Sequence, residues 1–123
     1  MGKKGFRELV VWQKAKDLAV IIYQLSNQAP LSKDFALRDQ MRRSAISIAS
    51  NIAEGDERDT DKESVRFLFI AKGSLAELRT QLEIAFEIGF LQEDNYLELE
   101  GRSEELGKMI GRLIKVRQST YSP

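Results

Sequence analysis

The side chains best suited to chemistry in this chain are its arginines and lysines, and that chemistry is the binding of phosphate. Arg38, Arg42 and Arg43 form one cluster, in which the first two are neighbours on one side of any helix. Arginine forks fit phosphate, but they fit carboxylates across an interface equally well, and Asp39 lies within the cluster. Phosphate contact and structural ion pairing therefore both remain open for these arginines.

A second group of cations would gather where antiparallel helices bring the start of the first helix beside the end of the last. This group is Lys14, Lys108, Arg112, Lys115 and Arg117. Acidic residues at 56–61 share this end, so we expect it to be mixed and mildly basic, with acids concentrated at the other end. Both groups are predicted phosphate contacts, because such contacts add up across a patch. The alternative is an ordinary solvated surface.

The composition argues against enzymatic chemistry. The chain has no histidine and no cysteine, which removes the commonest general base, the commonest metal ligand and thiol catalysis. Ser44, Ser47 and Ser50 have no evident base, and Glu54, Glu77 and Glu83 lack the histidines of a di-metal bundle. We expect no catalytic residue, no metal and no cofactor.

The overall composition is that of one globular domain. The chain has 123 residues, 42% of them hydrophobic, and its 19 lysines and arginines balance 19 aspartates and glutamates. It has no apolar run near the roughly 20 residues that span a bilayer and no secretory signal pattern at its start. We expect a cytoplasmic protein with no membrane contact.

Four amphipathic segments predict four helices. The longest, at residues 64–89, repeats Leu68, Ala71, Leu75, Leu78, Leu82, Ala85 and Gly89 at helical spacing. The others are at 8–28, 33–54 and 94–117, the last with a stripe that includes Leu99, Leu106, Met109, Ile110, Leu113 and Val116. Short connections predict an all-α, antiparallel up-down-up-down four-helix bundle over residues 8–117. Residues 1–7 would be a flexible basic arm and 118–123 a frayed tail.

Capping residues set the expected helix ends. Ser32 is a candidate N-cap for the second helix, and Gly55 is a candidate left-handed C-cap for it. Thr60 with Glu63 resembles a capping box for the third helix. Gly73 lies within that helix, where glycine is unfavourable, so we expect a close approach to its backbone.

The two middle helices are apolar on more than one side. Their surplus positions are Ile46, Ala49 and Ala53 on the second helix and Ile70, Gly73, Ile84 and Ile88 on the third. A helix that is apolar on two sides needs two partners, so we predict self-association through these residues. Scattered surface isoleucines are the alternative.

Three motifs together resemble a known family. They are FRELVVWQKA at 6–15, QMRRSAISIASNIAEG at 40–55 and FLFIAKGSLAELRTQL at 67–82. In this order they are similar to the four-helix bundle proteins encoded by intervening sequences of bacterial large-subunit ribosomal RNA genes. One departure is Ala49, where many members have proline.

The resemblance implies a homopentamer and kinship with the accessory variability proteins of diversity-generating retroelements, which bind nucleic acid and a reverse transcriptase. We therefore expect a non-enzymatic oligomer that binds RNA or DNA, with a reverse transcriptase or another protein as a further partner. A protein-interaction scaffold without nucleic-acid binding is the alternative.

Overall fold

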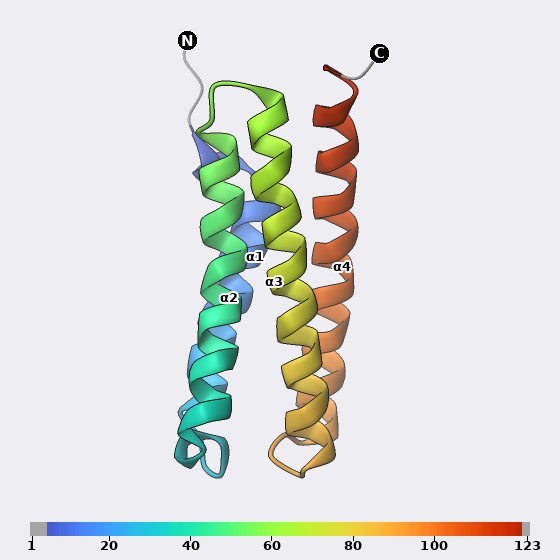
Figure 1. The fold of residues 1–123 in the computed structure, drawn as a ribbon. Coiled ribbons are helices and arrows are strands. Elements are labelled where there is room, and N and C mark those ends of the chain that lie inside the picture. The colour runs from blue at the N-terminus through green and yellow to red at the C-terminus, as the bar shows by residue number, and fades with distance from the viewer. Residues whose placement is uncertain (1–4, 122–123) are drawn as a thin grey trace.

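The computed structural model describes residues 5–121, which form four long helices packed side by side (Figure 1). They are α1 (Val10–Ser26), α2 (Phe35–Asp56), α3 (Asp61–Glu87) and α4 (Glu93–Gln118). Successive helices run in opposite directions, and α2 and α3 lie in front of α1 in the view of Figure 1. The predicted all-α single-domain bundle is confirmed.

The core is built from the predicted helical stripes. On α3 the buried positions include Leu68, Leu75, Leu78 and Leu82, each no more than 3% exposed. The other helices contribute Val11, Ala15, Leu18, Ile22, Met41, Ala45, Ile48, Ile52, Leu99, Leu106, Ile110 and Ile114. A period of about 3.6 residues places such positions on one side of a helix, and burying them stabilises the bundle.

The stripe of α4 differs from the predicted one at its end. Val116, assigned to the core from the sequence, is 63% exposed, whereas Ile114 is only 4% exposed. The spacing of the preceding residues therefore predicted the wrong apolar residue for the core in the last turns of α4: Ile114 is buried there, and Val116 is not. Met109 and Leu113 are partly buried against the core.

The predicted cap of α2 at its start was two residues too early. Ser32 lies in a 3₁₀ turn, Leu31–Lys33, and Asp34 caps α2 by accepting a hydrogen bond from the backbone N–H of Leu37 at 3.0 Å. At α3 the predicted N-cap is confirmed, because the Thr60 hydroxyl accepts from the Glu63 backbone N–H at 3.2 Å. Both arrangements satisfy a donor that the first helical turn leaves unpaired. The first helix ends at Ser26, short of the predicted residue 28.

Two glycines have roles that the sequence did not reveal. Gly55 is not a left-handed C-cap: it lies inside α2, where an added Cβ would be 3.0 Å from the carbonyl oxygen of Ser64 and 3.3 Å from the Cβ of Phe67. Gly89 does have a positive φ, of +82°, and it lies in the turn after α3 rather than in the helix. Gly55 therefore permits α2 and α3 to approach closely at one end.

Small polar side chains continue this close contact along the two helices. The hydroxyls of Ser47 on α2 and Ser74 on α3 are 2.8 Å apart. Asn51 donates to the backbone oxygen of Ser47 at 2.8 Å, so these polar groups are paired where they are partly buried.

Part of the predicted arm and part of the predicted tail lie within the described residues. Phe6–Glu8 form a 3₁₀ turn, and the Phe6 ring lies edge-on to Trp12 at 5.1 Å. After α4, the Thr120 hydroxyl donates to Asp61. The remainder of the predicted arm and tail, residues 1–4 and 122–123, lies outside the described residues.

Candidate nucleic-acid interface

The eight predicted phosphate-binding residues do not form one patch. Arg38, Arg42 and Arg43 lie in the first turns of α2, whereas Lys108, Arg112, Lys115 and Arg117 lie in the second half of α4. Because α2 and α4 begin at the same end of the bundle, these two groups lie toward opposite ends (Figure 1). Lys14, on α1, lies beside α4.

Arg117 is engaged within the bundle. Its guanidinium donates to Oδ1 of Asp56 at 2.9 Å and to the hydroxyl of Ser64. The side chain of Arg117 is 15% exposed and that of Asp56 is fully buried. Arg117 therefore ties the end of α4 to α2 and α3, and it offers little surface to a ligand.

Arg42 is also held by its own chain. It donates to the Ser26 hydroxyl at 2.7 Å and to Oδ1 of Asn27 at 2.8 Å, and it lies over the ring of Tyr23. These contacts join the start of α2 to the end of α1, which supports the structural alternative for this arginine.

Arg38 has a similar set of internal contacts. Its guanidinium donates to the Ser32 backbone oxygen at 3.1 Å and to Asp39 at 2.9 Å, and it lies over the ring of Phe35. Arg38 therefore stabilises the turn before α2.

The remaining predicted cations are more accessible. Lys14 pairs with Glu105 at 3.2 Å and Lys108 with Glu104 at 3.4 Å, all with exposed side chains. Such surface pairs contribute little to stability and exchange readily. Arg43, Arg112 and Lys115 are exposed and make no hydrogen bond or ion pair with another residue of the range 5–121.

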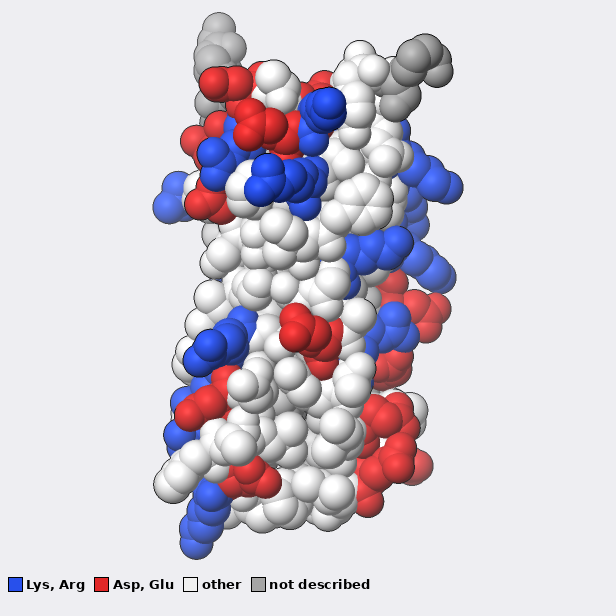
Figure 2. Space-filling view, in the orientation of Figure 1, with Lys and Arg blue, Asp and Glu red and all other residues white. Residues whose placement is uncertain are grey.

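The packing of α3 against α4 adds a cation that the sequence did not single out. Lys72 lines a hollow between these helices together with Lys108. Arg112 and Lys115 follow Lys108 at helical spacing, so all four charges lie on the outer side of α3 and α4. We call Lys72, Lys108, Arg112 and Lys115 the cationic flank. Figure 2 shows Lys and Arg side chains gathered at the upper right, over the end of α4, with acidic side chains below them.

The acidic end has its own hydrogen bonds. The Tyr96 hydroxyl donates to Glu83 at 2.6 Å, and its ring stacks on Phe86 with centroids 4.5 Å apart. This hydrogen bond lowers the pKa of Glu83 and raises the pKa of Tyr96 to about 12. A side-chain hydrogen bond between Glu87 and Glu83, together with the negative charge of Glu83, raises the pKa of Glu87. The described residues contain no cluster of acids that could hold a metal ion.

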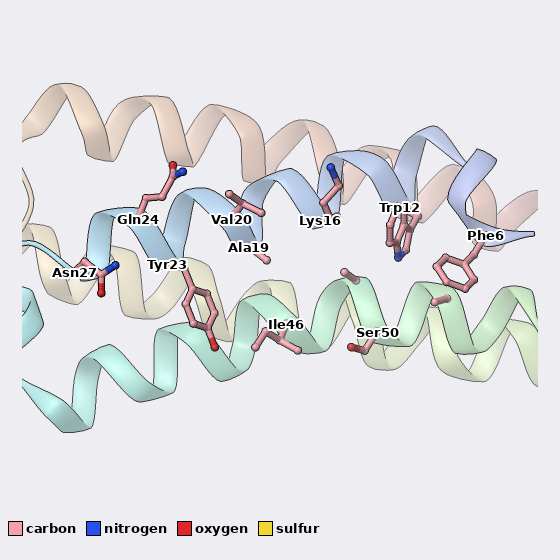
Figure 3. Close-up of a pocket in the computed structure, with 12 residues that line it drawn as sticks. Phe6, Trp12, Lys16, Ala19, Val20, Tyr23, Gln24, Asn27, Ile46 and Ser50 are labelled. Carbon is pink, nitrogen blue, oxygen red and sulfur yellow. The ribbon is translucent and has the colours of Figure 1, made fainter.

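A second surface feature is an apolar groove of about 630 Å³ between α1 and α2 (Figure 3). Part of the groove is lined by short side chains, which are those of Ala49, Ser50 and Ala53 on α2 and Ala19 on α1. Larger side chains also line the groove, namely Phe6, Trp12, Val20, Tyr23 and Ile46. Of the predicted oligomer interface, the structure thus places Ile46, Ala49 and Ala53 in this groove. Ile70, Gly73, Ile84 and Ile88 lie on the exposed side of α3.

Within residues 5–121, no helix is both long enough and apolar enough to cross a membrane. The fold is shared with known proteins. A model of the 23S rRNA-intervening sequence protein family matches residues 7–112. A crystal structure of a protein of unknown function from the S23 ribosomal protein family of Bacteroides thetaiotaomicron is similar to this one, with a TM-score of 0.80 and 27% sequence identity. The match covers 86% of this chain and 99% of that one.

A search of curated proteins finds no match. The family match covers most of the chain; it includes the second and third of the three motifs in full and all of the first except Phe6. The chain belongs to the 23S rRNA-intervening sequence protein family.

Proposed function

We propose that the protein is a non-enzymatic homo-oligomer that binds the phosphate backbone of RNA through the cationic flank. The observation that carries this proposal is the exposed group of Lys72, Arg112 and Lys115, which have no acidic partner among the described residues, beside the weakly paired Lys108. Four such cations in one subunit give a modest site. Repetition of the flank around an oligomer would add their contacts along one polymer.

Backbone contact is the mode of recognition that this surface supports. Lysine and arginine side chains on the outside of long helices reach phosphates, and such contacts position a nucleic acid without reading its sequence. DNA would satisfy the same charges, so a comparison of RNA with DNA of matched length belongs in the test.

Filter binding to a structured RNA tests the proposal. We expect affinity to fall steeply between low and moderate salt, and we expect Arg112→Glu to weaken binding and reduce the salt slope by roughly 0.7 to 0.9. Arg102→Glu is the matched control, because Arg102 is on the same helix and is paired with Glu98 at 3.2 Å. Absence of RNA binding at low salt would refute the proposal.

A failure of RNA binding would favour the scaffold alternative. A protein partner, such as a reverse transcriptase, that docks on apolar or acidic surface should still be captured after Lys115→Glu. Equal effects of Arg112→Glu and Arg102→Glu on RNA affinity would instead show that net charge, and not the cationic flank, governs binding.

Self-association is supported by exposed isoleucines on α2 and α3. Ile46 is 44% exposed, Ile70 45%, Ile84 47% and Ile88 51%. Single exposed apolar residues are ordinary, but three of these four share the outer side of α3, and Figure 2 shows little charge across the middle of the face over α2 and α3. The family resemblance favours a pentamer.

Charge placed on this surface should separate the subunits. We expect Ile84→Glu to give monomers in sedimentation experiments while the helical circular dichroism is kept, and we expect the same of Ile46→Glu. Arg102→Glu is a control that adds negative charge to an exposed position on α4, outside the isoleucine surface. A wild-type protein that sediments as a monomer at micromolar concentration would contradict self-association.

A further inference from the structure

We propose that neighbouring copies join head to tail, with the outer side of α3 of one copy seated in the groove between α1 and α2 of the next. This inference rests on the proposed self-association and names the two surfaces that would meet. We call the outer side of α3, formed by Ile70, Gly73, Glu77, Ile84 and Ile88, the α3 ridge.

The two surfaces differ in shape and lie on neighbouring sides of the subunit. The groove is a hollow between two helices, whereas the α3 ridge is the convex side of one helix. In Figure 1, α2 and α3 face the viewer and α1 lies behind α2, so the groove opens on the flank next to the ridge. A two-fold contact between ridges would leave the groove empty, whereas a head-to-tail contact covers both surfaces. Because the surfaces lie on adjacent sides, successive copies would turn toward a closed ring and not extend into a straight filament.

The heights of the two surfaces along the bundle also agree. The hydroxyl contact between Ser47 and Ser74 fixes the register of α2 against α3. Because α2 and α3 run in opposite directions, one residue back from Ser74 on α3 matches the height of one residue forward from Ser47 on α2. Gly73 therefore lies level with Ile48, the residue next to Ala49. In a ring whose axis is parallel to the helices, every copy keeps the same height. Gly73 would then meet the part of the next groove where Ala49 lies.

The size of the residues at this level favours close packing of helices. An added Cβ at Gly73 would meet nothing within 4 Å beyond its chain neighbours and the adjacent backbone of its own helix, so the close approach predicted from this glycine does not occur within the subunit. Glycine within a helix is unfavourable, and packing inside the bundle does not account for it. The short side chains of Ala49, Ser50 and Ala53 in the groove would let the α3 backbone of a second copy approach there.

The charges are complementary at the next level down. The acidic residue of the α3 ridge is Glu77, about one turn after Ser74. It lies at the height of Ser44, which is about one turn before Ser47 on α2 and is adjacent to Arg43. Arg43 lines a second hollow with Tyr23 and Ile46, next to the apolar groove. Neither Glu77 nor Arg43 has an ion-pair partner among residues 5–121. The head-to-tail contact brings the carboxylate of one copy to the guanidinium of the next.

Further along, an exposed aromatic ring is available to the end of the ridge. Ile84 lies as many residues after Ser74 on α3 as Leu37 lies before Ser47 on α2, so these two residues are at the same height. Phe35 is close to Leu37 in the chain and is 64% exposed. The ridge therefore meets small residues, then a cation, then an aromatic ring, and it carries a glycine, an acid and an isoleucine in the same order.

Disulfide trapping between different chains tests this pairing, and the natural chain has no cysteine to interfere. One protein carries Gly73→Cys and a second carries Ala49→Cys. The two are mixed, dissociated, reassembled and oxidised. We expect a covalent dimer in the mixture and none when either protein is oxidised alone. Lys72→Cys replaces Gly73→Cys in the control, since Lys72 faces α4 and not the ridge.

The outcomes separate this inference from the proposed self-association. A wild-type oligomer with no cross-link in the mixture would overturn the head-to-tail pairing and leave self-association standing. A cross-link of Gly73→Cys with itself would show a two-fold contact between ridges and would equally overturn it. A monomeric wild-type protein would refute both.

Discussion

Removal of the Arg117 guanidinium should destabilise the bundle and leave the cationic flank unchanged. In Arg117→Met the aliphatic part of the side chain is retained, but Asp56, which is fully buried, loses the guanidinium that pairs with it at 2.9 Å. Breaking a buried pair from one side typically costs 3–5 kcal/mol. Because Arg117 is 15% exposed, we expect a loss near the lower limit, about 3 kcal/mol.

Urea unfolding followed by circular dichroism measures this loss. With a slope of roughly 1–3 kcal/mol/M, the midpoint should fall by about 1–3 M. All proteins are compared at one concentration, because assembly would shift the apparent stability. Arg112→Met is the matched control: it removes the same group from the same helix at an exposed position and should change the free energy of unfolding by at most about 0.5 kcal/mol.

Two results would refute this reasoning. One is a free energy of unfolding for Arg117→Met within about 1 kcal/mol of the wild type, and the other is an equal loss of stability in Arg112→Met; either would mean that burial does not distinguish the two arginines. A double-mutant cycle with Asp56→Asn adds a direct measurement, and we expect a coupling energy of about 1–3 kcal/mol for contacting groups.

Other predictions follow from the glycines and from the acidic end. Gly73→Ala should raise the stability of the separated subunit by up to about 1 kcal/mol, because its site is open and alanine favours the helix. Gly55→Ala should gain less or lose stability, since the new methyl group would press on the backbone oxygen of Ser64 at 3.0 Å; thermal unfolding of both variants compares them, and an equal gain would contradict the close approach. Tyr96→Phe should raise the pKa of Glu83, because the hydroxyl that lowers it is lost; carboxyl NMR titration measures the change, and an unaltered Glu83 titration would argue against the hydrogen bond.

The bundle could be predicted because its signals are local. The repeat that contains Leu75 and Leu78 specifies a buried helical face without any knowledge of its partners. Helix ends were less predictable, since several nearby residues can serve as caps. Ser32 and Asp34 are both capable N-caps, and the 3₁₀ turn that precedes α2 decides between them.

The candidate site could be predicted only in part, because the availability of a cation depends on residues far along the chain. Arg112 and Arg117 look alike on α4, yet only Arg117 reaches Asp56 and Ser64. Lys72 joins the cationic flank through the packing of α3 against α4, which no local pattern reveals. The same limit explains Gly55, whose role depends on the α3 backbone beside it.

The position of Trp12 offers a way to observe the groove in the unmodified protein. The chain has one tryptophan, and its indole lines the groove between α1 and α2 (Figure 3). Indole emission moves to longer wavelength when water gains access to the ring. Under the proposed self-association, a red shift on dilution would therefore report the uncovering of this surface, and it would give a dissociation curve without any attached dye.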